Sequence, residues 1–258
     1  MPLAVVDRKS RHEISLMRRA GQIVAEVHAL TREALKPGVS TLDLDVIAEA
    51  HIRKSGALPT FKGYHGFPAT LCTSINDEVV HGIPNAERRL QEGDVISIDV
   101  GATYKGMIAD AAYTAGVGAI SADCQRLLAA TEESLMAAIE QMRDGRCLED
   151  VSGAVEDVCL KYGFGLVRNY GGHAVGRQLH EEPFVHNFRT GERGPLLRPG
   201  SILAIEPMFN LGGDDVYTAG DKWTVLTCDH LPSAHFEHTV VVTEADPEIL
   251  TRLRPSPA

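Results

Sequence analysis

GDVISID at residues 93–99 and GSILAIE at residues 200–206 are two apolar runs that each end in an acidic residue. The runs lie 107 positions apart (200 − 93 = 107), and two turn sequences containing Gly38 and Gly145 show the same offset (145 − 38 = 107). A constant offset indicates an internal duplication. The two acidic residues that end the runs then take equivalent positions in two related halves of the chain.

Helical and extended patterns follow the same order in each half. Four helical segments are expected, at about residues 13–36, 41–56, 122–142 and 148–162. Extended runs follow each helical pair, first over residues 69–117 and then up to residue 242. We therefore predict an α+β fold, in which helices back a mainly antiparallel sheet. The chain is expected to form a single domain, residues 1–258, made of halves at about residues 13–118 and 122–243.

Composition and charge argue against several classes of protein. The 258 residues carry 25 Lys and Arg against 35 Asp and Glu, and this formal charge of −10 disfavours a nucleic-acid-binding surface. No apolar run approaches the ~18 residues of a membrane span, and residues 1–9 lack the pattern of a secretory signal. The five cysteines are dispersed without a C-x-x-C pair, which is typical of a reducing compartment. We expect a cytoplasmic monomer that binds neither membranes nor nucleic acids.

Four acidic residues occur in segments whose neighbours are apolar and strand-forming: Asp99, Asp110, Glu206 and Glu237. A two-residue turn at residues 105–106 would make Asp110 a diagonal neighbour of Asp99 on one sheet face. Each acid taken alone would suit a solvent-exposed strand end or an ion pair. The four together do not, because these strands contain almost no Lys or Arg and converging carboxylates repel one another. Two divalent cations would remove the repulsion, so the sequence predicts a metal cluster.

Histidines in glycine-rich or turn sequences complete the candidate site. His173 and His180 lie in NYGGHAVGRQLHEEP at residues 169–183, where glycines let the backbone approach a ligand closely. His81 precedes a Gly-Ile-Pro turn. The chain contains no H-E-x-x-H pattern, which argues against a helical zinc-protease site. The other histidines are expected to be structural or surface residues: His12, His28, His51, His65, His186, His230, His235 and His238.

This combination resembles the site of the type I methionine aminopeptidases, in their bacterial form without an N-terminal extension. The likeness runs through nearly the whole chain, in MRRAG (17–21), YHGFP (64–68), SINDEVVHGIP (74–84), HEEP (180–183), IEP (205–207), WTV (223–225) and EHT (237–239). The resemblance implies the pita-bread fold, in which two pseudo-symmetric halves of a curved, mainly antiparallel sheet enclose a dinuclear metal site.

The resemblance also implies a metal-dependent hydrolase that removes the N-terminal methionine from nascent proteins and peptides and prefers a small second residue. The implied metal ligands are Asp99, Asp110, His173, Glu206 and Glu237. They would hold two divalent ions, and the ligand set suits Co, Mn, Fe(II) or Zn. A hydroxide bridging the two ions would attack the peptide carbonyl. The implied partner is the N-terminal methionine of nascent chains, near the ribosome.

Further roles follow from the resemblance around the metal ligands. Glu206 would shuttle the proton of the attacking water, His180 would lie near the carbonyl oxygen, and His81 would lie near the scissile nitrogen. Together with both histidines, an apolar slot would bind the substrate methionine; its lining residues are Tyr64, Phe67, Cys72 and Trp223. Apolar and sulfur-containing side chains suit a flexible thioether.

Some positions differ from the common pattern of the family. Phe61 stands in place of a frequent cysteine, and Leu179 stands in place of a common phenylalanine. Ala174 replaces a common glycine, and residues 108–109 replace a frequent His-Gly pair. All implied metal ligands are present, whereas the sequence does not predict how these differences affect substrate preference and rate. Two alternatives are an Xaa-Pro aminopeptidase-like hydrolase, which would carry a further N-terminal domain, and a metal-free pita-bread binding module, which would have lost metal ligands.

Overall fold

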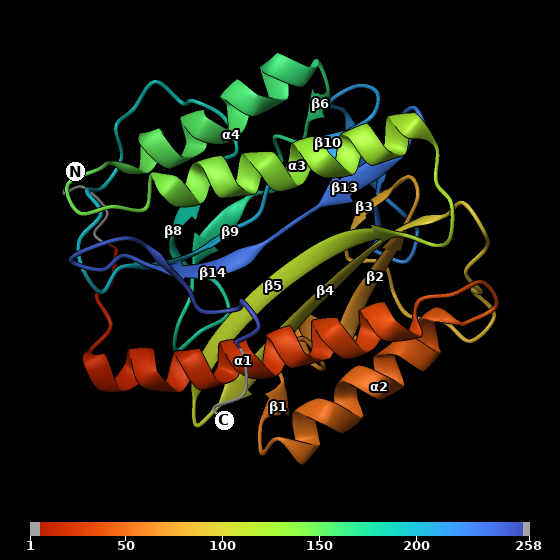
Figure 1. Ribbon diagram of the computed structural model, residues 1–258, viewed down its shortest axis with the longest axis horizontal. Helices are drawn as coiled ribbons and strands as arrows, with labels where there is room; N and C mark the ends of the chain where they lie inside the picture. The colour runs from red at the N-terminus through yellow and green to blue at the C-terminus, as the bar shows by residue number, and fades with distance from the viewer. Residues whose placement is uncertain (1–5, 255–258) are drawn as a thin grey trace.

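The computed structural model describes residues 6–254, and its α-helices form two pairs on opposite sides of a set of strands (Figure 1). The first pair is α1 (Arg11–Ala34) and α2 (Thr41–Lys54), and the second pair is α3 (Ala122–Glu140) and α4 (Leu148–Tyr162). The predicted helices are confirmed, with ends no more than two residues from the expected ones. Within the described residues, no helix has the length and apolar character needed to cross a membrane.

The strands are short, apart from the long hairpin of β4 and β5. In chain order they are β1 (Leu58–Pro59), β2 (Leu71–Ile75), β3 (Glu78–Val80), β4 (Val95–Tyr104), β5 (Met107–Gly116), β6 (Gly165–Leu166), β7 (Gly172–Ala174), β8 (Glu181–Val185), β9 (Ile202–Ile205), β10 (Met208–Asn210), β11 (Val216–Thr218), β12 (Val225–Thr227), β13 (Ser233–His235), β14 (His238–Val241) and β15 (Glu248–Ile249). A 3-10 helix, η1 (Tyr64–Gly66), lies between β1 and β2.

These strands form small sheets whose pairs are antiparallel, as the sequence predicts. Their orders are β1-β4-β2 with β5 added to β4, β15-β14-β9-β7-β8, β13-β10-β6 and β11-β12-β3. The predicted α+β class is confirmed. Figure 1 shows β5 and β14 side by side between the two helix pairs.

Local sequence explains where the first two helices begin. The Ser10 hydroxyl accepts a hydrogen bond from the Glu13 amide, and the Glu13 carboxylate accepts one from the Ser10 amide. Ser40 and Asp43 form the same reciprocal pair at the start of α2. Such capping boxes satisfy amides that have no partner inside the helix. The apolar period predicts that α1 begins at about residue 13, whereas it begins at Arg11. The polar residues that follow Ser10 do not contribute to that period.

A two-residue turn joins β4 to β5 in the expected register. Residues 105–106 have φ angles of 50° and 81°, the left-handed conformation that a tight hairpin requires. Gly101 pairs with Asp110, which makes Asp110 a diagonal neighbour of Asp99. β4 continues past Asp99, where the apolar run ends, to Tyr104. The residues after Asp99 interrupt the apolar pattern, yet their backbones still pair with β5 and β1.

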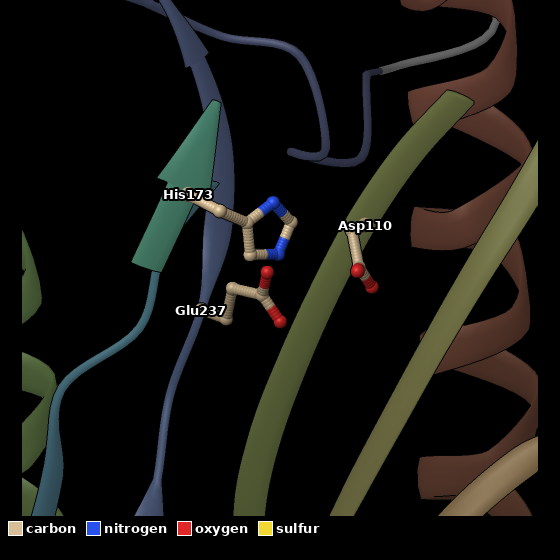
Figure 2. Close-up of side chains that lie close together, drawn as sticks. All are labelled: Asp110, His173 and Glu237. Atoms are coloured by element: carbon tan, nitrogen blue, oxygen red, sulfur yellow. The ribbon is translucent and has the colours of Figure 1, made fainter. Parts of the chain in front are cut away.

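Backbone hydrogen bonds join β5 to the start of β14 and thereby connect distant parts of the chain. The Ala112 amide donates to the Glu237 carbonyl at 3.3 Å, and the Glu237 amide donates to the Ala112 carbonyl at 2.9 Å. The Thr239 hydroxyl accepts from the Asp110 amide at 2.9 Å and donates to the Asp110 carbonyl at 2.8 Å. We call this contact the β5–β14 seam. Asp110 and Glu237 lie close together across it (Figure 2).

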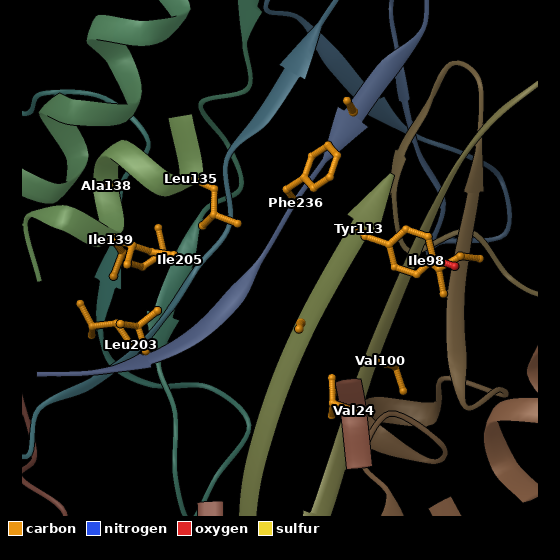
Figure 3. Close-up of a cluster of buried hydrophobic side chains, with 14 of the residues drawn as sticks. Val24, Ile98, Val100, Tyr113, Leu135, Ala138, Ile139, Leu203, Ile205 and Phe236 are labelled. Carbon is orange, nitrogen blue, oxygen red and sulfur yellow. The ribbon is translucent and has the colours of Figure 1, made fainter. Parts of the chain in front are cut away.

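One apolar core links both helix pairs to the strands between them. Ile139 of α3 lies close to Ile205 of β9, and Val24 of α1 lies close to Val100 of β4 (Figure 3). Each of these side chains is fully buried or nearly so, and burial of such a side chain contributes about 1.5–3 kcal/mol. The strands that carry the candidate site therefore rest on a packed support from both sides.

Two helical glycines offer a matched test of packing. A Cβ at Gly21 of α1 would lie 2.3 Å from the backbone oxygen of Leu250, whereas a Cβ at Gly153 of α4 would meet the end of the flexible Arg189 side chain at 2.9 Å. Alanine is favoured over glycine in a helix by about 1 kcal/mol. We expect Gly153→Ala to keep or raise the free energy of unfolding and Gly21→Ala to lower it by about 2 kcal/mol. Urea unfolding followed by circular dichroism measures both, and equal stabilities would contradict the close packing at Gly21.

Candidate active site

Three buried side chains from distant parts of the chain converge at the β5–β14 seam (Figure 2). Asp110 lies on β5, His173 lies on β7, and Glu237 directly precedes β14. One carboxylate oxygen of each acid and one ring nitrogen of the histidine all lie within 4.8 Å of one another. This spacing allows one cation to contact all three groups, because metal bonds to such ligands are about 2.0–2.2 Å long.

Glu206 and Asp99 lie beside this group. Glu206 follows β9, and its two carboxylate oxygens lie 3.7 Å from His173 Nε2 and 3.6 Å from His235 Nε2. Asp99, in the middle of β4, is close enough to Asp110 for the two carboxylates to influence each other's pKa. The five ligands expected from the sequence all line one cavity.

Burial and mutual repulsion favour the protonated forms of these acids. Burial raises the pKa of Asp110 from 3.8 to about 7. Burial, followed by the charge of Asp110, raises the pKa values of Asp99, Glu206 and Glu237 well above their usual range. Of residues 6–254, no lysine or arginine lines the cavity. The protein therefore supplies no positive side chain there, and a bound cation would restore the ionised carboxylates.

Unpartnered buried atoms test whether cations fit this cluster. Among the described residues, Asp99 Oδ1, Asp110 Oδ1 and Glu237 Oε1 are buried and accept no hydrogen bond. Buried polar atoms in proteins are normally paired, so three free carboxylate oxygens on one cavity wall are unusual. Cations would satisfy all three at once, and four carboxylates with one imidazole suit divalent metals.

The hydrogen bonding of His173 leaves one of its ring nitrogens available for a metal. Its Nδ1 donates to the carbonyl oxygen of Ala174 at 3.1 Å, because that oxygen can only accept. The lone pair is then on Nε2, the atom that faces Glu206. Burial lowers the pKa of His173 to about 3, so the ring is neutral at ordinary pH. A neutral, oriented imidazole is the form that binds metals.

An apolar slot occupies the other side of the same cavity. Its lining residues are Phe61, Tyr64, Phe67, Cys72, His81, Leu179, His180 and Trp223. The rings of Phe67 and Trp223 meet edge to face with 5.1 Å between their centroids, a favourable arrangement for aromatic pairs. Cys72 pairs with Asp99 across β2 and β4, and burial raises the pKa of its thiol, which keeps it neutral. All the slot residues named from the sequence thus lie beside the acids.

Two histidines stand at the boundary between the slot and the acids. His180 Nδ1 lies 2.9 Å from Tyr64 Oη, and its ring meets that of His173 edge to face at a centroid distance of 4.4 Å. His81 follows β3 with a φ of 61°, a conformation that residues other than glycine adopt mainly where the surrounding structure forces it. Burial lowers the pKa of His180, and it lowers the pKa of His81 to about 4. Both rings are therefore neutral at ordinary pH.

A second cavity continues the site outward. Its walls include Tyr170 and Phe184, and it shares four residues with the first cavity: His81, His173, His180 and Glu206. Glu206 is the one acid of the four that lines both cavities, and its side chain remains 15% exposed. Glu206 thus connects the acid cluster and its apolar slot to a second, adjoining cavity.

His235 belongs to the site although the sequence analysis placed it among the structural or surface histidines. Its side chain is buried, its Nε2 has no hydrogen-bond partner among the described residues, and this atom lies 3.6 Å from Glu206. The signal that points to it is its position two residues before Glu237 in an extended run, because such residues share a face. Within residues 6–254, none of the eight histidines assigned to that class lines the cavity itself, and His235 approaches the site only through Glu206.

Comparisons with known proteins point to one family. The model of metallopeptidase family M24 matches residues 15–244. Methionine aminopeptidase 1 of Mycobacterium tuberculosis is 51% identical over 253 residues, which cover 96% of this chain and 95% of that protein. Methionine aminopeptidase 1 of Bacillus subtilis is 47% identical over 245 residues, which cover 95% of this chain and 98% of that protein.

Solved structures extend the likeness to three dimensions. The crystal structure of methionine aminopeptidase from Thermotoga maritima matches with a TM-score of 0.94 and 40% identity, covering 96% of this chain and all of the other (100%). The prolidase from Pyrococcus horikoshii shares the fold, with a TM-score of 0.78 and 21% identity, but this chain covers 64% of it. The predicted pita-bread fold is confirmed. Because the likeness spans almost the full length of the relatives, this chain belongs to metallopeptidase family M24 and, within it, to the methionine aminopeptidases.

Proposed function

We propose that this protein removes the N-terminal methionine from peptides and nascent proteins and prefers substrates with a small second residue. The observation that carries the proposal is the single cavity that combines the acid cluster with an apolar slot. A slot of this kind suits one unbranched apolar side chain beside the acids, as removal of a terminal methionine requires. His81 and His180 line both cavities, so both side chains lie where the slot meets the second cavity.

The metal cofactor is inferred to be a pair of divalent cations. The residues that would hold them are Asp99, Asp110, His173, Glu206 and Glu237. The unpartnered carboxylate oxygens and the oriented, neutral His173 support this assignment. Co, Mn, Fe(II) and Zn are all compatible with the ligand set. When bound, such cations lower the pKa of a shared water and polarise the substrate carbonyl.

The side chains around the metals would perform the proton transfers and orient the substrate. Glu206 would accept a proton from the attacking water and pass it to the leaving amine, a role supported by its contact with both cavities. With Tyr64 as the donor to His180 Nδ1, the N–H of His180 would be on Nε2, where it would stabilise the developing oxyanion. Such a donor is typically worth about 2.7–4 kcal/mol. His81 would contact the scissile nitrogen.

The methionine side chain would lie among the aromatic and sulfur-containing residues of the slot: Tyr64, Phe67, Cys72 and Trp223. Phe61 and Leu179, which differ from the common family pattern, line the same slot and would therefore adjust its shape. The proposed partner is the N-terminus of nascent chains near the ribosome, and the protein is proposed to act as a cytoplasmic monomer.

Release of methionine from the peptide Met-Ala-Ser tests the proposed function. We expect release to stop when a chelator is present and to return when Mn(II) or Co(II) is added in excess, since the acid cluster requires cations. Mass spectrometry of the products measures the reaction, with Met-Trp-Ser as the control for the second residue. Absence of metal-dependent release would contradict the proposal. Cleavage of Xaa-Pro peptides alone would favour the prolidase-like alternative, and metal-free binding without cleavage would favour a binding module.

A further inference from the structure

Lys9 is a buried lysine that lies between the N-terminal segment and the loop that carries His180. Its side chain is 1% exposed, and its Nζ lies 2.6 Å from Asp7 Oδ2 and 2.6 Å from Glu181 Oε2. A buried ammonium group is costly unless charged partners surround it, and here two carboxylates do so. The residue therefore has a specific set of contacts, which involve chain segments 172 positions apart.

Glu181 uses its second oxygen to close the turn before it. Glu181 Oε1 accepts hydrogen bonds from the Arg177 amide at 2.7 Å and from the Gln178 amide at 3.1 Å. The stem of Lys9 passes directly over Gly176, where a Cβ would lie 2.1 Å from Lys9 Cε. One carboxylate thus connects the lysine to the backbone of residues 177–181, the turn in which His180 is the fourth residue.

A second connection runs from the same turn to the start of α1. The Arg177 guanidinium donates to Asp7 at 2.6 Å and also to Glu13. Glu13 is the residue that completes the capping box of α1 with Ser10. We call the group Asp7, Lys9, Arg177 and Glu181 the latch.

The latch fixes the backbone on one side of His180, while Tyr64 fixes the imidazole on the other. The Tyr64 hydroxyl lies 2.9 Å from His180 Nδ1, and the ring of His180 meets that of His173 at 4.4 Å. A donor acts on a developing oxyanion only if it is held in place before the reaction. A displacement of about 1 Å in such a group can cost a hundredfold in rate.

We propose that Lys9 is a positioning residue for His180: it holds Glu181, which closes the turn that aims the imidazole at the substrate carbonyl. This inference rests on the proposed function for its effect on catalysis. The geometry of the latch does not depend on that function.

The first experiment compares two variants that each remove the cationic end of an ion pair from the same part of the fold. Lys9→Met keeps the apolar stem and removes the ammonium group. Arg18→Met is the matched control, because Arg18 binds Glu248 through two bonds of 2.6 and 2.8 Å and touches no residue of the latch. We expect kcat for Met-Ala-Ser to fall about tenfold in Lys9→Met, with KM changed less than twofold, and to stay at the wild-type value in Arg18→Met. Equal kcat values in the two variants would overturn the proposal.

The second experiment measures the turn directly, in the metal-free protein. Hydrogen exchange followed by mass spectrometry should show at least tenfold faster exchange in peptides covering residues 176–182 of Lys9→Met, with β4 and β5 unchanged. Unchanged exchange over residues 176–182 would overturn the proposal. If the wild-type enzyme fails to release methionine, the proposed function is wrong. The exchange measurement still shows whether Lys9 holds the turn in place.

A double variant keeps the test decisive if Lys9→Met does not fold. Lys9→Met with Glu181→Gln removes both buried charges, so that no unpaired charge remains. The amide oxygen of glutamine can still accept from the turn, but the connection to the N-terminal segment is lost. We expect the same tenfold loss of kcat and the same faster exchange. Wild-type values for both would overturn the proposal.

Discussion

Replacing Glu206 with glutamine is expected to lower kcat for methionine release by about a thousandfold while the fold remains intact. Glutamine keeps the shape of the side chain but cannot accept the proton of the attacking water. The two carboxylate oxygens already face the neutral rings of His173 and His235 at 3.7 and 3.6 Å, so the amide has room in the same position. Burial lowers the pKa values of both histidines to about 3, and neither ring therefore depends on a charged Glu206.

Metal binding has to be measured alongside the rate, because Glu206 is also a proposed ligand. Titration calorimetry with Mn(II) gives the affinity, and the peptide assay is then run at saturating metal. Glu244→Gln is the control, since Glu244 is exposed and lies outside both cavities. We expect this control to match the wild-type enzyme in affinity and rate. A metal-loaded Glu206→Gln enzyme with near-normal kcat would contradict the proton-transfer role.

Local sequence was sufficient to predict the helices and to place Asp110 beside Asp99. Apolar spacing and the capping serines place the helices, because both signals act within a few residues. The turn at residues 105–106 fixes the register of β4 and β5, which in turn places Asp110 beside Asp99. The acids are visible in the sequence because a carboxylate within an apolar strand is too costly to occur without a partner.

The rest of the site depends on contacts that no local pattern contains. The β5–β14 seam joins Ala112 to Glu237, which are 125 positions apart (237 − 112 = 125). His235 enters the site only because the seam places β13 and β14 against β5. The resemblance singles out Phe61 and Leu179 as departures from the family pattern, whereas no local pattern places them at a cavity; the folded chain places both there. The Lys9–Glu181 pair is invisible for the same reason.

The halves predicted at about residues 13–118 and 122–243 stay a prediction. The order of helices and strands in the two segments is compatible with a duplication, since each begins with a helix pair followed by strands. Asp99 lies within β4, whereas Glu206 directly follows β9, so the two acids hold similar but not identical places in their strands.

In the metal-free protein, the free energy of unfolding is expected to fall as the pH rises from about 6.5 to 8.5. Burial raises the pKa of Asp110 to about 7 and raises those of Asp99, Glu206 and Glu237 further above their usual range. A carboxyl group whose pKa is higher in the native state keeps its proton longer there than in the unfolded chain. The free energy of unfolding therefore falls as the pH passes from the unfolded pKa through the native pKa.

Buried histidines make the free energy of unfolding rise with pH, but they do so over a lower pH range. Burial lowers the pKa values of His28, His173 and His235 to about 3. Their contribution to the free energy of unfolding rises with pH up to the unfolded value near 6.5 and is constant above it. Above about pH 6.5 the acid cluster therefore determines whether the free energy of unfolding rises or falls with pH. One pKa unit corresponds to about 1.4 kcal/mol, so Asp110 alone is expected to contribute a loss on the order of 1 kcal/mol as the pH passes 7, and the other three acids add to this loss.

Thermal unfolding with a chelator, repeated with saturating Mn(II), measures this effect, and Asp110→Asn is its matched variant. Mn(II) should abolish the fall in Tm, because bound cations offset the repulsion between ionised carboxylates. Without metal at pH 8, Asp110→Asn should be more stable than the wild-type protein, since it removes one of the buried charges. It should also gain less from Mn(II). A chelated wild-type protein whose Tm is constant from pH 6.5 to 8.5, or an Asp110→Asn variant that is no more stable than wild type at pH 8, would show that these carboxylates do not repel one another in the metal-free fold.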